Sequence, residues 1–295
     1  MKIINAHVHM LELRPGDAMP AEVAVLKGLA KTLPLLKTEE LLRQMDVAGI
    51  EKSVLYAVAA PIVYASNEHV ARLCREHPDR FIGFASSDVH GAGAVTELRR
   101  AVEVDGLRGF KFHPPLQGFS PDDPKMDPIY ELAVSLNVPI VFHTGTTPFG
   151  KFARLKYANP ILLDEVACRW PRLRILITHL GTLWHNEAMM VVEKNPGVFL
   201  DTSDYPPWIR KLVTPDNVQR VGEGKYIFGT DYPMPYRGEA HDLGMYVKCI
   251  KGLPLPEPII RGIFWDNFWT FLNGRENLDR VVTGADLATL NTGNP

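Results

Sequence analysis

Eight short apolar runs, each followed by a helix-like or loop segment, constrain the fold of this 295-residue chain more than any other feature. Apolar strands that alternate with helices form parallel βαβ units, and eight such units close into a (β/α)8 barrel, which commonly needs about 250 residues. We therefore predict an α/β fold in which a single TIM-barrel domain takes up residues 1–295. The predicted strands span residues 2–7, 53–58, 81–85, 109–113, 139–143, 174–179, 198–202 and 226–231.

Helix signals between the runs support this order. Thr38 can cap a helix over residues 39–48 that Gly49 ends, and Thr214 followed by proline can open another. After the eighth run, residues 257–272 are apolar on much of their circumference. This pattern predicts a closing helix that packs against the barrel.

One long segment interrupts the regular alternation. Residues 10–37 separate the first strand from the first predicted helix, and residues 21–32 within them have a helical pattern. Long loops that follow barrel strands line the active-site face. The insertion is therefore predicted to lie near that face as a lid or a substrate wall, with a solvated surface loop as the alternative.

Histidines and an aspartate stand at the ends of four of the predicted strands. His7 and His9 end the first strand and share one face of it, because side chains alternate along a strand. His143, His179 and Asp231 end the fifth, sixth and eighth strands. The carboxyl ends of barrel strands meet at one face, so these five side chains are expected to converge. A lone histidine is usually a buried, hydrogen-bonded ring, but the whole set outlines a mononuclear or dinuclear metal site.

The motifs around these residues resemble the amidohydrolase superfamily, and within it the amidohydrolase-2 branch of metal-dependent hydrolases and decarboxylases. That branch includes enzymes like aminocarboxymuconate-semialdehyde decarboxylase. The resemblance covers nearly the whole chain and is specific for the superfamily, not for a reaction. Its motifs are INAHVH at 4–9, GFKFHP at 109–114, VFHTG at 141–145, THLG at 178–181, FGTDYP at 228–233 and, more loosely, IRGIFWDN at 260–267.

The resemblance implies a metal cofactor and two catalytic residues. His7, His9, His143 and Asp231 would hold one divalent ion, Zn²⁺ in the first place, with Mn²⁺ or another first-row ion as alternatives. Asp231 would accept a proton from a metal-bound water, and His179 would hydrogen-bond the oxygen that gains negative charge.

Other polar and aromatic residues are candidates for substrate binding. Lys111 and His113 share the barrel-facing side of the fourth strand. In some members of the resembled superfamily a lysine on this strand becomes carboxylated and bridges two metals, so Lys111 could do the same, or it could pair with an acidic group or a substrate carboxylate. His113 could contact substrate or only fix its loop. The remaining candidates lie in loops after strands five, six and eight: Arg154, Trp184, Tyr232 and Arg237.

Three classes of function fit these observations. The sequence favours a hydrolase that attacks a small lactone, ester or cyclic amide with metal-activated water. The alternative is non-oxidative decarboxylation of an aromatic or unsaturated acid, in which arginines bind a carboxylate. A metal-stabilised binding protein without turnover is the third, and the complete ligand set argues against it.

Charge and composition narrow the partners to a small-molecule substrate. The formal net charge of −2 provides no excess of positive charge for binding nucleic acid. Three scattered cysteines form no CxxC pair, and neither a signal peptide nor a membrane span is predicted, so a cytoplasmic location is expected. Dimers are frequent in the resembled family, which leaves a homodimer open.

Overall fold

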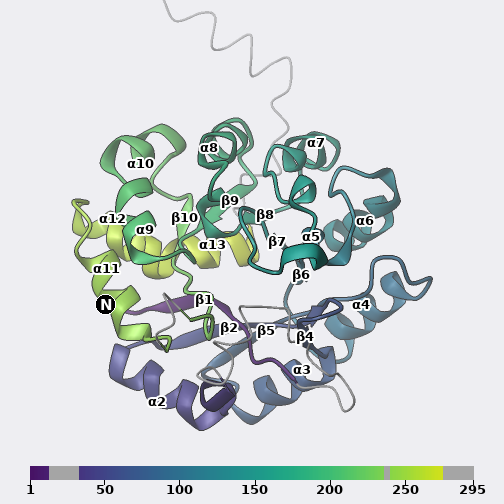
Figure 1. Cartoon of the computed structure of the whole chain (residues 1–295), viewed down its shortest axis with the longest axis horizontal. Coiled ribbons are helices and arrows are strands. Elements are labelled where there is room, and N and C mark those ends of the chain that lie inside the picture. The colour runs from purple at the N-terminus through teal and green to yellow at the C-terminus, as the bar shows by residue number, and fades with distance from the viewer. Residues whose placement is uncertain (13–32, 236–239, 275–295) are drawn as a thin grey trace, which may run out of the picture.

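The computed structural model describes residues 1–12, 33–235 and 240–274, and each of the eight predicted runs contains a strand there. The strands lie in the middle of the molecule, and helices surround them (Figure 1). The strands in barrel order are β1 (Ile4–Val8), β2 (Lys52–Tyr56), β5 (Phe81–Phe84), β6 (Phe110–Phe112), β7 (Ile140–Phe142), β8 (Ile175–Ile177), β9 (Val198–Asp201) and β10 (Tyr226–Ile227).

The strands pair in parallel and close into a barrel. They form two sheets, in the orders β1-β2-β5 and β10-β9-β8-β7-β6. Backbone bonds join the sheets at both edges: Ala85 N donates to Gly109 O over 2.7 Å, and Ala6 N donates to Phe228 O over 2.8 Å. The predicted (β/α)8 barrel is confirmed.

Alternate residues of the short strands divide the apolar core in two. One set of residues points into the barrel and packs with the C-terminal helix. The alternate residues point outward and pack against the surrounding helices. The interior set contains Ile4, Ala6, Val54, Tyr56, Phe84, Val141, Leu176, Phe199 and Ile227.

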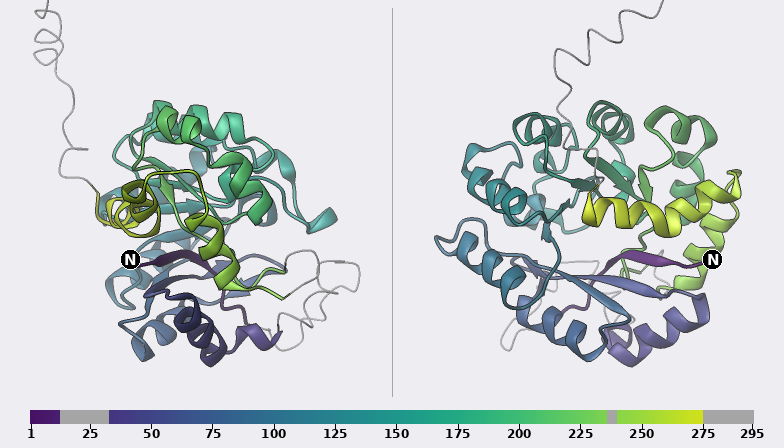
Figure 2. Two further views of the ribbon diagram at one scale, coloured as in Figure 1. Left: turned by 90° about the vertical axis from the view of Figure 1, so that its left-hand side faces the viewer. Right: turned by 180° about the vertical axis from the view of Figure 1, so that it is seen from behind.

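The closing helix lies across one end of the barrel, as the view from behind shows (Figure 2). It runs as α12 (Glu257–Arg261), a π-turn η7 (Gly262–Asp266) and α13 (Asn267–Asn273). Phe268 and Phe271 join the interior cluster, so this end of the barrel is filled with side chains. The active-site end must therefore be the opposite one, where the strands reach their carboxyl ends.

A buried arginine fixes the closing helix to the barrel. The guanidinium of Arg174 donates to the carbonyls of Phe271 (2.8 Å) and Leu272 (3.1 Å), and to Asn137 Oδ1 (2.6 Å). Arg174→Ala is expected to lower the free energy of unfolding by about 3 kcal/mol, because buried carbonyls lose their donors. Arg108→Ala is the control: Arg108 also donates to this helix, but at the surface, so its loss should cost under about 0.5 kcal/mol in a urea titration. Equal losses in the two variants would contradict this assignment.

The other helices cover the outside of the barrel. Thr38 was expected as a cap but forms the first residue of its helix, so this prediction is wrong by one position; Gly49 ends the helix at a φ of 72° as predicted. Thr214 caps its helix by accepting from Asn217 N. These helices are α2 (Thr38–Ala48), α3 (Asn67–Glu76), α4 (Ala94–Glu103), α6 (Asp127–Ser135), α7 (Leu162–Arg169), α8 (His185–Lys194), α9 (Pro206–Leu212), α10 (Pro215–Val221) and α11 (Leu243–Lys251).

Near the barrel mouth, one feature was not predicted and one prediction falls mostly outside the described residues. A small antiparallel hairpin, β3 (Val58–Ala59) and β4 (Tyr64–Ala65), follows the second strand and was not predicted. Most of the 10–37 insertion, with its predicted helix at 21–32, lies outside the described residues; its described end is the short helix η2 (Leu33–Leu36). None of the helices in the described ranges is long and apolar enough to cross a membrane.

Candidate metal centre and active-site pocket

A β-bulge in β1 aims the two histidines into the barrel mouth. Asn5 pairs with Ser53 and Val8 pairs with Leu55, so β1 has one more residue than β2 between these points. Ala6 belongs to the interior cluster and Val8 to the outer core, which leaves His7 facing inward directly after another inward residue. A bulge of this kind is a common way to redirect a side chain next to an active site.

His7, His9 and Asp231 bring three ligand atoms to one point. Nε2 of His7 lies 3.1 Å from Nε2 of His9, and Oδ1 of Asp231 lies 3.2 and 3.5 Å from these two nitrogens. The three ligand atoms lie within 4.8 Å of one another. Two imidazole nitrogens and a carboxylate oxygen are donors that Zn²⁺ and Mn²⁺ accept, so this set fits a divalent ion.

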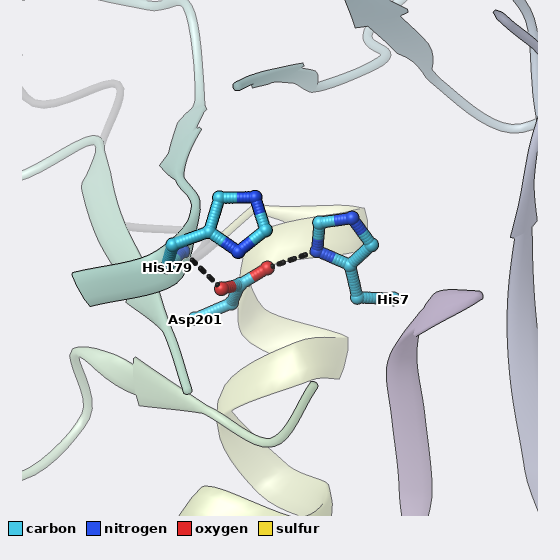
Figure 3. Close-up of side chains that lie close together, drawn as sticks. All are labelled: His7, His179 and Asp201. Carbon is cyan, nitrogen blue, oxygen red and sulfur yellow. Dashed lines mark hydrogen bonds and ion pairs between the residues drawn. The ribbon is translucent and has the colours of Figure 1, made fainter. Parts of the chain in front are cut away.

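Asp201, which the sequence analysis missed, orients this centre from beneath. It ends β9 and accepts a 2.7 Å hydrogen bond from Nδ1 of His7 and a 2.8 Å bond from the backbone N–H of His179 (Figure 3). With its proton on Nδ1, His7 presents the lone pair of Nε2 toward Asp231. A carboxylate that fixes the tautomer in this way is typical of metal-ligating histidines.

His7, His179 and Asp201 form a second cluster of possible ligand atoms, but its carboxylate is already engaged. Oδ2 of Asp201 is bonded to His7, and Oδ1 receives the N–H groups of His179 and Ser203 (2.8 and 3.0 Å). A second metal here would have to displace these bonds. The geometry therefore favours one ion, held by the cluster that contains Asp231.

We expect Asp201→Asn to weaken metal binding by about 10- to 100-fold, because the variant loses the charge that holds the His7 tautomer. Competition with a chelator measures this affinity. Asp204→Asn is a matched control: Asp204 lies in the adjacent loop and accepts from Thr182, without a bond to the proposed ligands. An Asp201 variant that binds metal as tightly as the control would refute the orienting role.

His143, the fourth predicted ligand, stands beside His179 and outside both ligand clusters. Nδ1 of His179 bonds the carbonyl oxygen of Ser203 over 2.7 Å, so this nitrogen carries the proton. Nε2 of His179 then accepts from Nδ1 of His143 over 3.0 Å. Nε2 of His143 is consequently a lone-pair donor, buried and without a partner among the described residues. Such an orphaned nitrogen is what a metal ligand requires, and the role of His143 stays a proposal.

Burial and charge keep these groups in their ligating forms. Burial lowers the pKa of His7 and of His143 well below the ordinary histidine value, so both rings stay neutral. Burial alone would raise the pKa of Asp231. The adjacent His9 and His7 outweigh it and hold the pKa of this carboxyl below its usual range. The site thus combines neutral imidazoles with an ionised carboxylate.

His179 and Asp231 also adopt a backbone conformation that non-glycine residues rarely use. Their φ angles are 56° and 57°, in the left-handed region. This conformation costs about 1–2 kcal/mol per residue. The strain coincides with the two residues that the sequence analysis assigned to catalysis.

A cavity of about 510 Å³ opens above the centre. Its floor includes His9, His143, His179 and Asp231, and its walls are mainly apolar. The apolar lining is made of Val58, Val63, Pro148, Phe149, Met234, Pro235 and Tyr246. A pocket with one polar, metal-binding end and apolar walls suits a small, flat molecule.

The structure separates two of the predicted substrate-binding residues by depth. His113 lines the cavity. Lys111 lies below it, fully buried, with its ammonium 5.0 Å from the ring centre of Tyr56 and no hydrogen-bond partner among the described residues. Burial lowers the pKa of Lys111 to about 8. Lys111 faces the barrel interior as predicted, and its role is untested.

None of the predicted loop candidates in the described residues lines the cavity. Tyr232 is a correction: its ring is buried in the outer core and its hydroxyl donates to Leu35 O over 2.6 Å. Arg154 is exposed and Trp184 half-buried, and neither contributes to the cavity lining. Arg237 lies outside the described residues. The path of a loop is not set by strand periodicity, which explains these differences.

The sequence is similar to known decarboxylases. A family model described as Amidohydrolase matches residues 4–267. The 2-amino-3-carboxymuconate-6-semialdehyde decarboxylase of Dictyostelium discoideum is 28% identical over 220 residues, which cover 63% of this chain and 59% of that enzyme. The gamma-resorcylate decarboxylase of Rhizobium sp. (strain MTP-10005) is 25% identical over 260 residues, covering 68% of this chain and 78% of the enzyme.

Solved structures share the fold at low sequence identity. An uncharacterized TIM-barrel protein from Bordetella bronchiseptica superposes with a TM-score of 0.72 at 20% identity, covering 93% of this chain and 100% of its own. A 2,6-dihydroxybenzoate decarboxylase in complex with 2,6-dihydroxybenzoate gives 0.69 at 18% identity, with coverages of 92% and 99%. A dihydroxybenzoic acid decarboxylase from Polaromonas sp. JS666, with bound manganese and 2-nitroresorcinol, gives 0.67 at 18%, with coverages of 95% and 99%.

Proposed function

Because the chain belongs to the amidohydrolase family, we propose that it is a metal-dependent decarboxylase of a small aromatic or unsaturated carboxylic acid. Membership of this family makes the chain an enzyme, either a hydrolase or a lyase. The observation that carries the proposal is the cavity, in which apolar walls stand over the converging ligand atoms of His7, His9 and Asp231. The sequence relatives favour the lyase, since both of those described above are decarboxylases.

His7, His9 and Asp231 would hold one divalent ion, with His143 as the fourth ligand. His143 is included because its Nε2 is buried and unpartnered. When bound, the ion supplies positive charge that binds and polarises the oxygens of the substrate. The manganese in the Polaromonas enzyme makes Mn²⁺ as reasonable an occupant as Zn²⁺.

Asp231 would carry the proton of the reaction. Its carboxylate is ionised in the free protein and forms part of the cavity floor, so it can take the proton of a ring hydroxyl on the entering substrate. It then returns this proton to the ring carbon that bears the carboxylate. The bond between that carbon and the carboxylate breaks, and its electron pair restores the ring as CO₂ leaves. The product keeps the single negative charge of the substrate, now on the ring oxygen.

The apolar walls would position the ring during this transfer. Val63, Phe149 and Tyr246 contribute carbon surface around the cavity, which favours a planar substrate over an extended polar one. Water is also displaced from this space when a ring enters, which strengthens the electrostatic interactions at the polar end.

Hydrolysis, which the sequence analysis favoured, becomes the second candidate. The same carboxylate could activate a water for attack on a lactone or an amide, so the site chemistry permits it. The decarboxylase relatives give it no support, and we rank it below the lyase for that reason.

A panel of hydroxybenzoates that includes 2,6-dihydroxybenzoate tests the proposal. Protein loaded with Mn²⁺ or Zn²⁺ should release CO₂ and form the corresponding phenol, and removal of the metal with a chelator should stop both. Incorporation of solvent oxygen into the product of a lactone or ester, with no CO₂ from any acid, would favour the hydrolase instead.

A further inference from the structure

We infer that His113 is a substrate-binding residue, whose Nε2–H donates a hydrogen bond to a carboxylate oxygen of the bound acid. The inference rests on the proposed function, because it names the group that holds the carboxylate before CO₂ leaves. It depends on three features of the described residues: the tautomer of His113, the fixed position of its ring, and the engagement of the other imidazoles.

The tautomer of His113 is set by a helix cap. His113 precedes the short helix α5 (Pro114–Gln117), and its Nδ1 accepts the backbone N–H of Leu116 over 3.3 Å. In the neutral ring the proton must therefore lie on Nε2. No described residue bonds this nitrogen, and His113 lines the cavity. Nε2–H is thus a donor available to a molecule in the cavity.

The ring is held in place from several sides. It stacks on His143, with the ring centres 3.8 Å apart and the planes 10° from parallel. The backbone N–H of His113 donates to Gln117 Oε1 over 2.8 Å, and Gln117 Nε2 in turn donates to the carbonyls of Ala59 (3.1 Å) and Ser87 (2.8 Å). The loop after β6 is therefore fixed to the loops after β2 and β5. A donor held in this way needs little reorganisation when an anion binds.

Three of the neighbouring imidazoles have their protons engaged elsewhere. The Nδ1–H groups of His7, His143 and His179 bond Asp201, His179 and Ser203, respectively. His9 has an unpartnered Nδ1, but that atom is buried. His113 is thus the imidazole in this set whose N–H faces the cavity without a protein acceptor.

A carboxylate is the group that needs this donor. No lysine or arginine occurs among the residues that line the cavity within the described ranges, and Lys111 is buried below them. An anionic substrate therefore lacks a charged side-chain partner in this part of the site. Hydrogen bonds from neutral N–H groups to a charged acceptor are among the stronger ones that a protein forms.

Two variants at one position separate the donor from the cap. Asn at position 113 can still accept the Leu116 N–H, as a good N-cap residue, but it does not reach the position of Nε2. Gln places an amide N–H close to that position. We therefore expect His113→Asn to weaken binding of 2,6-dihydroxybenzoate to the metal-loaded protein by about 10- to 100-fold, and His113→Gln to retain most of the affinity.

Resorcinol, the same ring without the carboxylate, identifies the oxygen that His113 binds. Its affinity should be unchanged in His113→Asn, and calorimetry can measure both ligands together with the metal content. Equal weakening for both ligands, or a normal affinity for 2,6-dihydroxybenzoate in His113→Asn, would overturn the inference. If the wild type binds neither ligand and releases no CO₂ from any acid, the proposed function fails; a decarboxylating wild type with an unaffected Asn variant refutes only the role of His113.

Discussion

Asp231→Asn is expected to lower kcat for decarboxylation by about 10²- to 10⁴-fold, the usual range for loss of a general acid–base group. The amide is nearly isosteric with the carboxylate but cannot take a proton from the substrate and return it to carbon. The variant should also bind metal more weakly, because Oδ1 of Asp231 lies 3.2 Å from Nε2 of His7 and would lose its charge. Assays at saturating metal separate the two effects.

Asp204→Asn serves as the control for this experiment. Asp204 is a second carboxylate in the cavity wall, and its side chain accepts from Thr182 instead of meeting the histidines. Burial raises its pKa, in contrast to that of Asp231. We expect less than about tenfold loss in kcat for this variant, because Asp204 lines the cavity but is not the proposed proton carrier. An active, metal-replete Asp231 variant would remove Asp231 from its proposed role.

His179→Asn is expected to lower kcat by about 10²-fold while each chain still binds about one metal ion. Asparagine can keep a donor to Ser203 O, but it lacks the Nε2 that accepts from His143. Without that acceptor, the ring of His143 loses the contact that directs its Nε2. The hydrogen bonds of neutral His179 leave its Nε2 without a proton. His179 therefore positions His143, and it could donate to a substrate oxygen only if Nε2 also carried a proton.

His185→Asn is the matched control for His179. His185 begins α8, lines no part of the cavity, and bonds Leu180 O over 2.8 Å through Nδ1. Its replacement should leave kcat close to that of the wild type. Metal analysis completes the test: a fall from two ions per chain to one in His179→Asn would support a dinuclear centre and contradict the single-ion assignment.

The barrel and most of its centre could be predicted from sequence because one rule links them. Short apolar runs give parallel strands, and the carboxyl ends of parallel strands in a barrel meet at one face. The same rule would have found Asp201, since it lies one residue before the end of the seventh predicted run and shares the inward side of its strand with Phe199. Asp201 stands between Leu200 and Thr202, without a histidine beside it, so the local sequence does not mark it as part of a metal site.

The loop residues could not be predicted by that rule. Tyr232 directly follows Asp231, yet its hydroxyl reaches Leu35 O, nearly two hundred positions earlier in the chain. Contacts of this kind depend on how loops pack together, which no local periodicity encodes. The cap that fixes the tautomer of His113 likewise appears only when the turn of α5 is present.

Because of the bulge in β1, the orientation of the histidine pair is not encoded by the HxH motif alone. In a regular strand, residues 6 and 7 would point to opposite sides. Here His7 points inward like Ala6, because β1 has one additional residue between Asn5 and Val8. Grafting the six residues INAHVH onto a strand without a bulge in another barrel would transfer the histidines but not their orientation. A designed copy of this centre would therefore have to include the β-bulge as well as the histidines.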